Sequence, residues 1–336
     1  MPRRGLTLGK FMPLHHGHAL LLRAAALHCD ELTVLVGMTP DDPYDIEQRM
    51  HWIDQLLSEF TDDRLSLTLV ADPDPDPNVT KDADGTVVDE AYWAQWLSQN
   101  AEHLNDIDHV FTSDRYGQQI AERIDARWFP VDPDREVVPI TATNIRTDRF
   151  AAFSFVHDVA KPDVCLTVAV VGAESTGKST LVKHLAEHYD THYAPEWGRI
   201  ISEAHSELTT SDFDAIVTMQ CEMIRSAQRL GNGLCFTDTE AITTALFAPI
   251  YLGHEHAPSQ QQAIAQQIDL YLLLDVSVPW IDDGTRVLDH DSRQRFHTAL
   301  MSTLENLNKP FQLIGGESHS QRQRQAVAAV DALLSR

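Results

Sequence analysis

The chain has 336 residues, of which 43% are hydrophobic and 23% are charged. This composition is typical of a globular protein with enough apolar residues for two cores of ordinary domain size, and it excludes wholesale disorder. No run approaches the roughly 20 apolar residues that cross a bilayer, and no signal-peptide pattern is present, so we expect a cytoplasmic protein without membrane insertion. The formal net charge of -24 repels nucleic-acid phosphates and argues against a nucleic-acid partner.

The first part of the chain alternates strand-like and helix-like patterns. Strands are expected at 5–11, 32–37, 65–70, 109–112 and 127–131, and helices at 19–28, 46–60 and 90–104. The beginning of this series is βαβαβ, the half-unit of a doubly wound parallel sheet. Residues 72–85 interrupt it with Asp-Pro repeats and glycine, which favours a solvated surface loop. Calcium binding is the alternative for this loop, although the EF-hand spacing is absent.

A second α/β unit begins near residue 164, just after the Lys161-Pro162 pair. Strands are expected at 164–171, 234–236 and 270–274, and helices at 180–189, 213–230 and from residue 240. The sequence therefore predicts an α/β fold with two doubly wound parallel-sheet domains. We expect the first domain to span residues 1-155 and the second to span residues 156-336.

The second unit carries a glycine-rich loop between its first strand and its first helix. Gly172-Ala173-Glu174-Ser175-Thr176-Gly177-Lys178-Ser179 fulfils every fixed position of the P-loop pattern. Glycines let backbone N–H groups converge on phosphates, and the helix N-terminus adds partial positive charge. We expect Lys178 to meet the phosphates of ATP and Ser179 to hold Mg²⁺. The residues expected to bind the nucleotide are Gly172, Ser175, Thr176, Gly177, Lys178, Ser179 and Thr180.

Two further segments of the second unit are candidates for its chemistry. Asp238 follows a strand, where it can hold Mg²⁺ or a substrate hydroxyl; capping of the next helix is the alternative. The polar stretch 278–286 and the residues after it carry arginines suited to close over a transferred phosphate. These are Arg286, Arg293 and Arg295, and a solvated loop with incidental arginines is the alternative.

The first unit has its own polar turn between a strand and a helix. In Gly9-Lys10-Phe11-Met12-Pro13-Leu14-His15-His16-Gly17-His18, both His15 and His18 can donate hydrogen bonds to phosphate at a helix N-terminus. Structural histidines are one alternative. Zinc binding is another, but no third and fourth ligands stand at a suitable spacing.

Two distant motifs of the first unit resemble a known superfamily. The string Gly9–His18 looks like the signature of the nucleotidylyltransferases, and Ile140-Thr141-Ala142-Thr143-Asn144-Ile145-Arg146 resembles their second motif, I-S-x-T-x-I-R. With the P-loop unit behind it, the chain resembles the NadR-type bifunctional family, which joins a nicotinamide-nucleotide adenylyltransferase to a ribosylnicotinamide kinase. The likeness extends to residues 173–175, 238–240 and 279–284, and it lacks the DNA-binding repressor domain that some members carry in front.

The resemblance implies a transferase of NAD biosynthesis and pyridine-nucleotide salvage. ATP would phosphorylate nicotinamide riboside to nicotinamide mononucleotide (NMN), and a second ATP would adenylylate NMN, giving NAD and pyrophosphate. The NMN phosphate would attack the α-phosphorus directly, so catalysis would consist of positioning and charge neutralisation. Thr143 and Arg146 would bind the leaving β and γ groups. The first-unit residues implied at the nucleotide are Gly9, Lys10, Phe11, His15, Gly17, His18, Thr143 and Arg146.

In the kinase half, the resemblance implies that Lys178, Ser179 and Mg²⁺ hold ATP while the arginines close on the transition state. Asp238 would hold the riboside or its Mg²⁺, and Glu196 is a second candidate base. A pyridinium ring favours aromatic faces, so aromatic side chains are expected around it, with core packing as the alternative. The residues expected at the riboside are Trp197, Arg199, Tyr251 and Asp238.

Departures from the family motifs leave competing functions open. Thr141 and Ala142 stand where the family usually has Ser or Gly, and Lys10 stands where Arg is frequent, which would weaken adenylyl transfer. The first unit would then be a degenerate binder that senses NAD or ATP beside an active kinase. A protein of another class, a P-loop regulatory ATPase acting on a partner protein, is the remaining alternative. A homo-oligomer is compatible with each of these functions.

Overall fold

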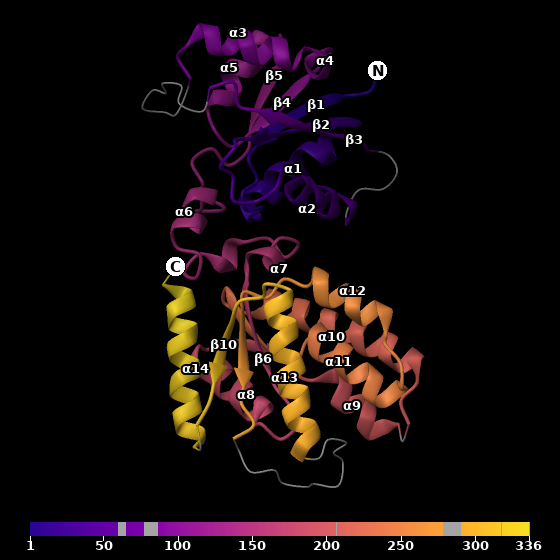
Figure 1. Cartoon of the computed structure of the whole chain (residues 1–336). Helices are drawn as coiled ribbons and strands as arrows, with labels where there is room; N and C mark the ends of the chain where they lie inside the picture. Colours follow the sequence, from indigo (N-terminus) through magenta and orange to yellow (C-terminus); the bar gives the residue numbers. More distant parts are fainter. Residues whose placement is uncertain (60–64, 77–86, 206, 278–289, 317, 336) are drawn as a thin grey trace. The chain divides into compact units, whose positions relative to one another are not determined.

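The computed structural model describes residues 1–59, 65–76, 87–205, 207–277, 290–316 and 318–335. The chain forms two compact units, Met1–Lys161 and Pro162–Arg336 (Figure 1). The division lies at the Lys161-Pro162 pair, a few residues after the boundary expected from the sequence. Within the described ranges, no helix combines the length and the apolar character that a membrane crossing requires.

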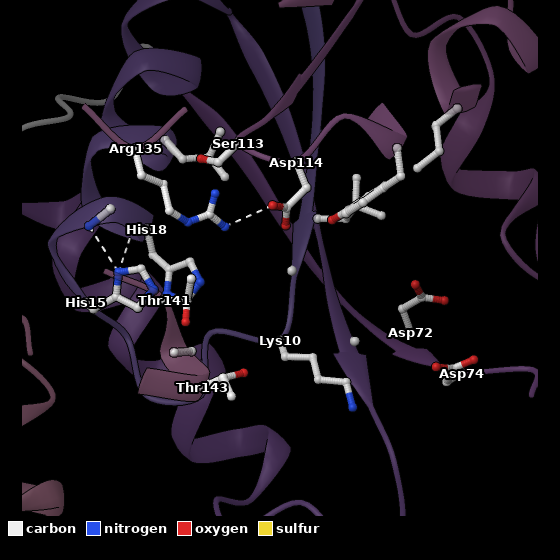
Figure 2. A pocket seen from close by; sticks show the side chains of 18 of the residues that line it. Lys10, His15, His18, Asp72, Asp74, Ser113, Asp114, Arg135, Thr141 and Thr143 are labelled. Atoms are coloured by element: carbon white, nitrogen blue, oxygen red, sulfur yellow. Dashed lines mark hydrogen bonds and ion pairs between the residues drawn. The ribbon is translucent and has the colours of Figure 1, made fainter. Parts of the chain in front are cut away.

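Unit 1 is built on a five-stranded parallel sheet with the order β3-β2-β1-β4-β5. Its strands are β1 (Arg4–Gly9), β2 (Glu31–Met38), β3 (Ser66–Pro73), β4 (His109–Thr112) and β5 (Arg127–Pro130). Its helices are α1 (His16–His28), α2 (Ile46–Ser58), α3 (Glu90–Gln99), α4 (Ala101–Leu104), α5 (Tyr116–Arg123) and α6 (Ala142–Thr147), followed by a short 3₁₀ helix, η1 (Phe153–Phe155). In such sheets ligands bind at the carboxyl ends of the strands, and a cavity opens at this edge (Figure 2).

One core layer of unit 1 joins the central strands to α3. Leu6 of β1, Leu35 of β2 and Val110 of β4 are buried and belong to the same cluster as Trp93 and Trp96. Aliphatic residues at these positions suit a pleated surface that is covered by a helix. The strands therefore form a rigid platform for the turns at their carboxyl ends.

Unit 2 is built on a second five-stranded parallel sheet, with the order β10-β9-β6-β8-β7. Its strands are β6 (Leu166–Val171), β7 (His192–Ala194), β8 (Leu234–Asp238), β9 (Leu270–Leu274) and β10 (Phe311–Ile314). A short helix, α7 (Lys161–Val164), precedes β6. The other helices are α8 (Lys178–His188), α9 (Trp197–Ala204), α10 (Thr210–Leu230), α11 (Ala241–Leu252), α12 (Ala257–Ala265), α13 (His290–Asn306) and α14 (His319–Leu334).

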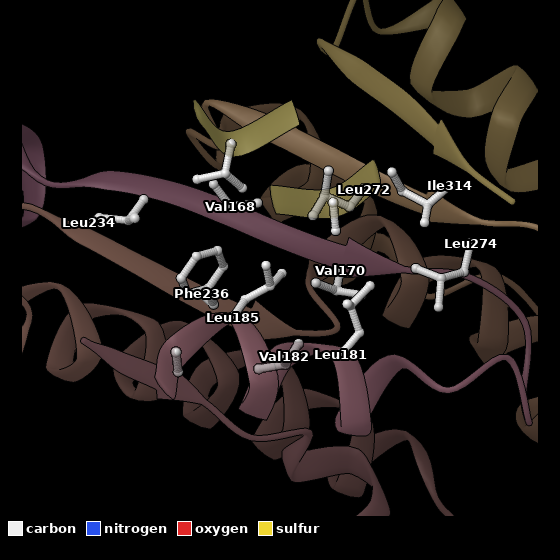
Figure 3. Close-up of a cluster of buried hydrophobic side chains, with 13 residues drawn as sticks. Val168, Val170, Leu181, Val182, Leu185, Leu234, Phe236, Leu272, Leu274 and Ile314 are labelled. Carbon is white, nitrogen blue, oxygen red and sulfur yellow. The ribbon is translucent and has the colours of Figure 1, made fainter. Parts of the chain in front are cut away.

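Successive residues of β6 contribute to opposite faces of this sheet. Val168 and Val170 pack in the layer formed with α8 and α14, which includes Phe236 (Figure 3). Ala169 and Val171 pack in the other layer, formed with α11, α12 and α13. Because both faces are covered, the strand is apolar except at Thr167, whose buried hydroxyl accepts from Gln228 Nε2 at 2.9 Å.

The predicted α/β class with two parallel sheets is confirmed, and two local predictions were wrong. The helix expected at 90–104 is interrupted at Asn100, whose side-chain amide donates to the Trp96 carbonyl at 3.1 Å and to Asp72 at 2.9 Å. Asp72 belongs to the edge strand β3 rather than to a surface loop, and it is 6% exposed. Residues 74–76 follow β3 without helix or strand structure, as expected, and residues 77–85 of the expected loop lie outside the described residues.

Candidate active sites

Unit 1 holds a cavity of about 540 Å³ at the carboxyl ends of its strands. Its walls come from the turn after β1, the ends of β2 and β3, the turns after β4 and β5, and α6 (Figure 2). The structure thus brings together two motifs that stand far apart in the sequence. The predicted residues that line this cavity are Gly9, Lys10, His15, Gly17, His18, Thr143 and Arg146.

His15 caps the N-terminus of α1. Its Nδ1 accepts hydrogen bonds from the backbone N–H groups of Gly17 at 3.1 Å and His18 at 3.4 Å. A nitrogen that accepts in this way is unprotonated, so neutral His15 carries its proton on Nε2. Burial lowers the pKa of His15 to about 4, and the charge of Arg135 adds to the shift. A Cβ on Gly17 would lie 2.9 Å from the His15 ring, so this cap requires glycine there.

His18 stacks on His15, with ring centroids 3.7 Å apart and an interplanar angle of 26°. Phe11 packs against His18 with the centroids 4.9 Å apart, and Phe11 is fully buried. Phe11 is absent from the described lining of the cavity, so it supports His18 rather than facing the cavity. Burial lowers the pKa of His18 well below 6.5. Both histidines are therefore neutral near pH 7 and act as hydrogen-bond donors, not as cations.

Lys10 lines the cavity next to the end of β2. Its Nζ donates to Thr39 Oγ1 at 3.2 Å and lies 3.5 Å from the Asp42 carboxylate. Arg49 of α2 is 1% exposed, and its Nη1 donates to the carbonyls of Lys10 at 2.8 Å and Gly37 at 2.7 Å. Arg49 thus ties the ends of β1 and β2 together beside Lys10. Sequence analysis did not single out Arg49, because a lone arginine on an amphipathic helix is ordinarily solvent-facing.

Helix α6 joins the second motif to the first. Thr141 caps this helix by accepting from the Asn144 N–H at 3.1 Å, and the Asn144 side chain accepts in return from the Thr141 N–H at 3.3 Å. Arg146 donates to the carbonyl of Met12 in the turn after β1 and to Thr143 Oγ1 at 3.1 Å. These contacts place Thr143 and Arg146 on the same cavity as the two histidines.

An aromatic corner of this cavity was missed by sequence analysis. Tyr92, Trp93 and Trp96 of α3 line it beside Asp72 and Asp74. The rings of Trp93 and Trp96 meet edge to face with centroids 5.9 Å apart. Asp72 accepts from Trp96 Nε1 at 3.0 Å, and burial raises the pKa of Asp72. Aromatic faces beside carboxylates are the features that bind an organic cation.

The P-loop of unit 2 has a backbone suited to phosphate. Gly172, Ser175 and Gly177 have φ values of 151°, 62° and 88°, which turn successive N–H groups toward one side. Lys178 begins α8, and its Nζ donates to the Ala173 carbonyl at 3.2 Å. The ammonium group therefore stays over the loop, where nucleotide phosphates would meet it. The loop and the first turn of α8 also hold the other predicted nucleotide ligands, Thr176, Ser179 and Thr180.

Two buried arginines hold the P-loop through its carbonyl groups. Arg322 of α14 is 3% exposed and donates to the Thr176 carbonyl at 2.7 Å and to Asp275 at 2.6 Å. Arg293 of α13 is 2% exposed and donates to the Glu174 carbonyl at 2.9 Å. Because the arginines engage carbonyl oxygens, the N–H groups of the loop stay available to a ligand.

The predicted cluster of arginines closing over phosphate needs correction. Arg293 belongs to a regular helix and supports the P-loop, so it does not stand on a flexible segment. Arg295 is exposed on the same helix, donates to Ser292 Oγ at 2.8 Å, and is absent from the described cavity walls. Arg286 and the phrase 279–284 lie outside the described residues.

Glu240, and not Asp238, caps the helix after β8. Glu240 accepts from the N–H groups of Ile242 at 2.6 Å and Thr243 at 3.0 Å. Thr239, with a φ of 76°, turns the chain between the two acidic residues. Asp238 is 3% exposed, and its Oδ1 has no hydrogen-bond partner among the described residues. A buried carboxylate oxygen in this state fits a cation or a hydroxyl donor.

Unit 2 has a cavity of about 750 Å³ beside the P-loop. Glu196 lines it together with Lys178 and the aromatic rings of Phe213, Phe247 and Tyr251. Burial raises the pKa of Glu196; the Lys178 charge opposes this shift and nearby carboxylates add to it. The phenylalanines were not singled out from the sequence, because an isolated Phe in a helix is ordinarily a core residue.

Of the other predicted riboside ligands, one lines this cavity and two are absent from its described lining. Arg199 lines the cavity, and its Nε lies 3.7 Å from Glu196. Trp197 and Asp238 are absent from the described lining. The backbone N–H of Trp197, at the start of α9, donates to Gln220 Oε1 at 2.9 Å. Trp197 is half-buried, and its contact with the riboside stays a prediction.

Two strand-to-helix turns with phosphate-binding motifs, each at the carboxyl edge of a parallel sheet and beside a cavity, are typical of a nucleotide-dependent protein. The chain is 30% identical, over 98% of its length, to the trifunctional NAD biosynthesis/regulator protein NadR of Escherichia coli (strain K12), of which the match covers 83%. The protein of the same name from Salmonella typhimurium (strain LT2) is 30% identical over 92% of this chain and 79% of its own. The chain belongs to the NadR family, and it is a transferase of NAD biosynthesis.

Further comparisons agree with the fold of the two units. A family model described as an AAA domain matches residues 167–322, which include the P-loop. A crystal structure of a NadR protein in complex with NR matches with a TM-score of 0.71 and 23% identity, covering 100% of this chain and 97% of that one. A NadR structure in complex with NAD and AMP-PNP matches with a TM-score of 0.69 and 22% identity over the same shares. These likenesses show the shared α/β fold.

Proposed function

We propose that the chain makes NAD from nicotinamide riboside in two ATP-dependent steps, one in each unit. In unit 2 the primary hydroxyl of the riboside attacks the γ-phosphorus of ATP and loses its proton, giving NMN and ADP. In unit 1 a phosphate oxygen of NMN attacks the α-phosphorus of a second ATP, giving NAD and pyrophosphate. The observation that carries the proposal is the presence of two strand-to-helix turns, each beside its own cavity, that suit a triphosphate.

Adenylyl transfer in unit 1 requires positioning and charge stabilisation rather than a covalent protein intermediate. His15 and His18 are neutral because burial lowers the pKa of each, so they would donate hydrogen bonds to the phosphates, His15 through Nε2. Lys10 would add positive charge from the end of β1. Thr143 and Arg146, adjacent on α6, would bind the pyrophosphate group that leaves.

The aromatic corner of unit 1 is the proposed place of the pyridinium ring of NMN. Tyr92, Trp93 and Trp96 border this corner with their rings, and the carboxyl groups of Asp72 and Asp74 stand beside them. A cationic ring gains from both, and the gain is larger in a corner that excludes water. This arrangement favours NMN, whose ring is cationic, over a neutral nucleotide as the acceptor.

Phosphoryl transfer in unit 2 would use Lys178 and the P-loop for ATP, with Mg²⁺ between ATP and the protein. Asp238 fits the metal because its buried Oδ1 has no other described partner, and Ser179 is the second proposed ligand. Mg²⁺ would supply charge neutralisation at the β and γ oxygens. Glu196 lines the cavity, burial raises its pKa, and its carboxylate is the proposed base that takes the hydroxyl proton. Tyr251 would face the riboside ring.

The test is to incubate the purified chain with nicotinamide riboside, ATP and Mg²⁺ and to follow products by chromatography. NMN is expected first, then NAD and pyrophosphate. Absence of NMN would remove the kinase step. Absence of NAD when NMN is supplied would remove the adenylyl step, and a kinase rate that then responds to added NAD would favour a sensor role for unit 1. ATP turnover indifferent to the riboside would favour a regulatory ATPase.

A further inference from the structure

The turn after β5 presents an arginine to the unit 1 cavity. Asp132 accepts hydrogen bonds from the backbone N–H groups of Val138 at 2.9 Å, Glu136 at 2.8 Å and Val137 at 3.2 Å. These donors, the Val138 N–H above all, hold the pKa of Asp132 below its usual range. Arg135, with a φ of 52°, lies inside this fixed turn and lines the cavity. Its backbone is therefore held in place while its side chain reaches inward.

Two reciprocal ion pairs join the turns after β4 and β5. Arg135 Nη2 lies 2.9 Å from Asp114, and Arg115 Nη2 lies 3.1 Å from Asp134. Arg135 and Asp114 both line the cavity, and Arg135 is directed at Asp114 beside His15 and His18 (Figure 2). The side chains of Arg115 and Asp134 are 62% and 66% exposed, and neither belongs to the described cavity lining. The same chemical pair thus occurs once facing the cavity and once facing solvent.

The charges of the cavity show why the inward arginine matters. Its described cationic lining consists of Lys10, Arg135 and Arg146. Lys10 is paired with Asp42, and Arg146 is held on the turn after β1 and on Thr143. Arg135 is the cation whose charge acts on both histidines: burial lowers their pKa values first, and Arg135 lowers them further. Since the histidines are neutral, the positive charge beside His15 comes from Arg135, and Arg146 adds its charge at His18.

We propose that Arg135 is a catalytic residue of the adenylyl transfer that contacts the reacting phosphates and exchanges Asp114 for them when substrates bind. This inference rests on the proposed function of unit 1. The reaction must bring two phosphate anions together, and a permanent guanidinium beside the histidines offsets their repulsion. Breaking the ion pair between Arg135 and Asp114 costs little free energy, because an ion pair this exposed contributes little to stability.

The test compares Arg135→Gln and Arg135→Lys with the wild-type chain in NMN adenylylation. Arg135→Gln is expected to lower kcat/KM about 100-fold. Arg135→Lys is expected to recover part of the loss, because it keeps the charge but not the two-pronged geometry. Arg115→Gln is the matched control, and it should leave the rate unchanged. Thermal unfolding of each variant, followed by circular dichroism, should match the wild type and reports that unit 1 remains folded.

A second variant, Asp114→Asn, distinguishes a contact of Arg135 with substrate from a role of Arg135 in holding the two turns together. If Arg135 only braces the two turns, Asp114→Asn must lower adenylylation as much as Arg135→Gln does, and that result would overturn the inference. If Arg135 contacts phosphate, Asp114→Asn should instead tighten ATP binding, because the guanidinium loses a competing anion. An Arg135→Gln chain with the wild-type rate would also overturn the inference.

A binding measurement keeps this inference distinct from the proposed function. In a Lys178→Ala chain, which lacks the P-loop lysine, calorimetry with α,β-methylene ATP reports chiefly on unit 1. Adding Arg135→Gln is expected to weaken this binding about tenfold. If the wild-type protein makes no NAD, the proposed function of unit 1 fails. The calorimetry is then still informative, because weaker binding in the Arg135→Gln chain supports the phosphate contact and unchanged binding overturns it.

Discussion

The two units place the turn that we propose to bind phosphate at the same position of a parallel sheet, but they build it by different means. Unit 2 uses backbone N–H groups of a glycine-rich loop, and its cation, Lys178, belongs to the same short motif. Unit 1 uses two neutral imidazoles at the turn and draws its cations from three separate segments, represented by Lys10, Arg135 and Arg146. One site is local in sequence, and the other is assembled by tertiary structure.

This difference changes what each site depends on. The P-loop is held by arginines that donate to its carbonyl oxygens, so its N–H groups are arranged before any substrate arrives. The unit 1 site requires the turn after β5 and helix α6 to stay packed near the turn after β1. We therefore expect that substitution of single P-loop residues abolishes the activity of unit 2. In unit 1, substitution of residues that hold the loops in place should lower the activity as well.

The largest expected effects come from substituting Lys178 in unit 2 and His18 in unit 1. Lys178→Ala should lower phosphorylation of the riboside about a thousandfold, because the loop loses the positive charge that faces the γ-phosphate. The same substitution should leave adenylylation of added NMN unchanged. His18→Ala should do the reverse, because it removes a donor at the α-phosphate. Rates of NMN and NAD formation, measured separately, check both. Parallel loss of both activities in either variant would contradict independent sites.

Much of the fold and half of each site could be predicted from the sequence. Strand patterns and the complete P-loop are local signals, and the string Gly9–His18 with Thr143 and Arg146 pointed to the unit 1 cavity before the structure did. The structure adds the contact that unites those motifs, the hydrogen bond from Arg146 to Met12. Signals of this kind succeed because the chemistry sits within a few residues of a strand end.

The residues that were missed share a physical cause. Arg49, Arg135 and Arg322 lie on helices or turns where the local pattern resembles an ordinary solvated surface. Their role follows only from which carbonyls or cavities they reach, and that is set by tertiary packing. Arg293 was expected to follow a polar, flexible stretch, whereas it is buried in α13 and donates to the P-loop carbonyl of Glu174. Its contact with phosphate stays a prediction.

An intermediate effect is expected from the supports of the P-loop. Arg322→Met removes the hydrogen bond to the Thr176 carbonyl and leaves Asp275 without its arginine. Because the loop then aims its N–H groups less accurately, KM for ATP in the kinase reaction should rise roughly tenfold, with a smaller change in kcat. Steady-state kinetics at varied ATP measures this split.

The control for this prediction lies on the same helix. Arg324 is exposed on α14, so Arg324→Met should leave KM for ATP unchanged. Adenylylation of added NMN by the Arg322→Met chain should also stay at the wild-type rate, because unit 1 has its own turn. A lower melting temperature of Arg322→Met with unchanged KM would mean that Arg322 only stabilises unit 2.

The smallest expected effect concerns the pH dependence of unit 1, where the imidazole cap differs from the glycine-based loop of unit 2. The pKa of His15 is lowered from 6.5 to about 4, mainly by burial, so the unfolded chain takes up the proton first as the pH falls. Stability is therefore fully present above about pH 6.5 and is lost as the pH falls toward 4, by about 1 kcal/mol per pH unit for this group. His157, with a pKa lowered to about 4 by burial, adds a loss of the same sign.

The variant that isolates this contribution is His15→Asn, because asparagine also caps helices and does not titrate. Between pH 7 and pH 5, hydrogen exchange of the α1 amides in the His15→Asn chain should show a shallower loss of protection than in the wild type. The exposed His51→Asn serves as the control and should keep the wild-type slope. Equal slopes in all three chains would mean that the His15 cap does not titrate with folding. Arg135 and His16, whose charges act on His15, are the same in each chain, so a difference in slope would belong to His15 and to the His18 ring stacked on it.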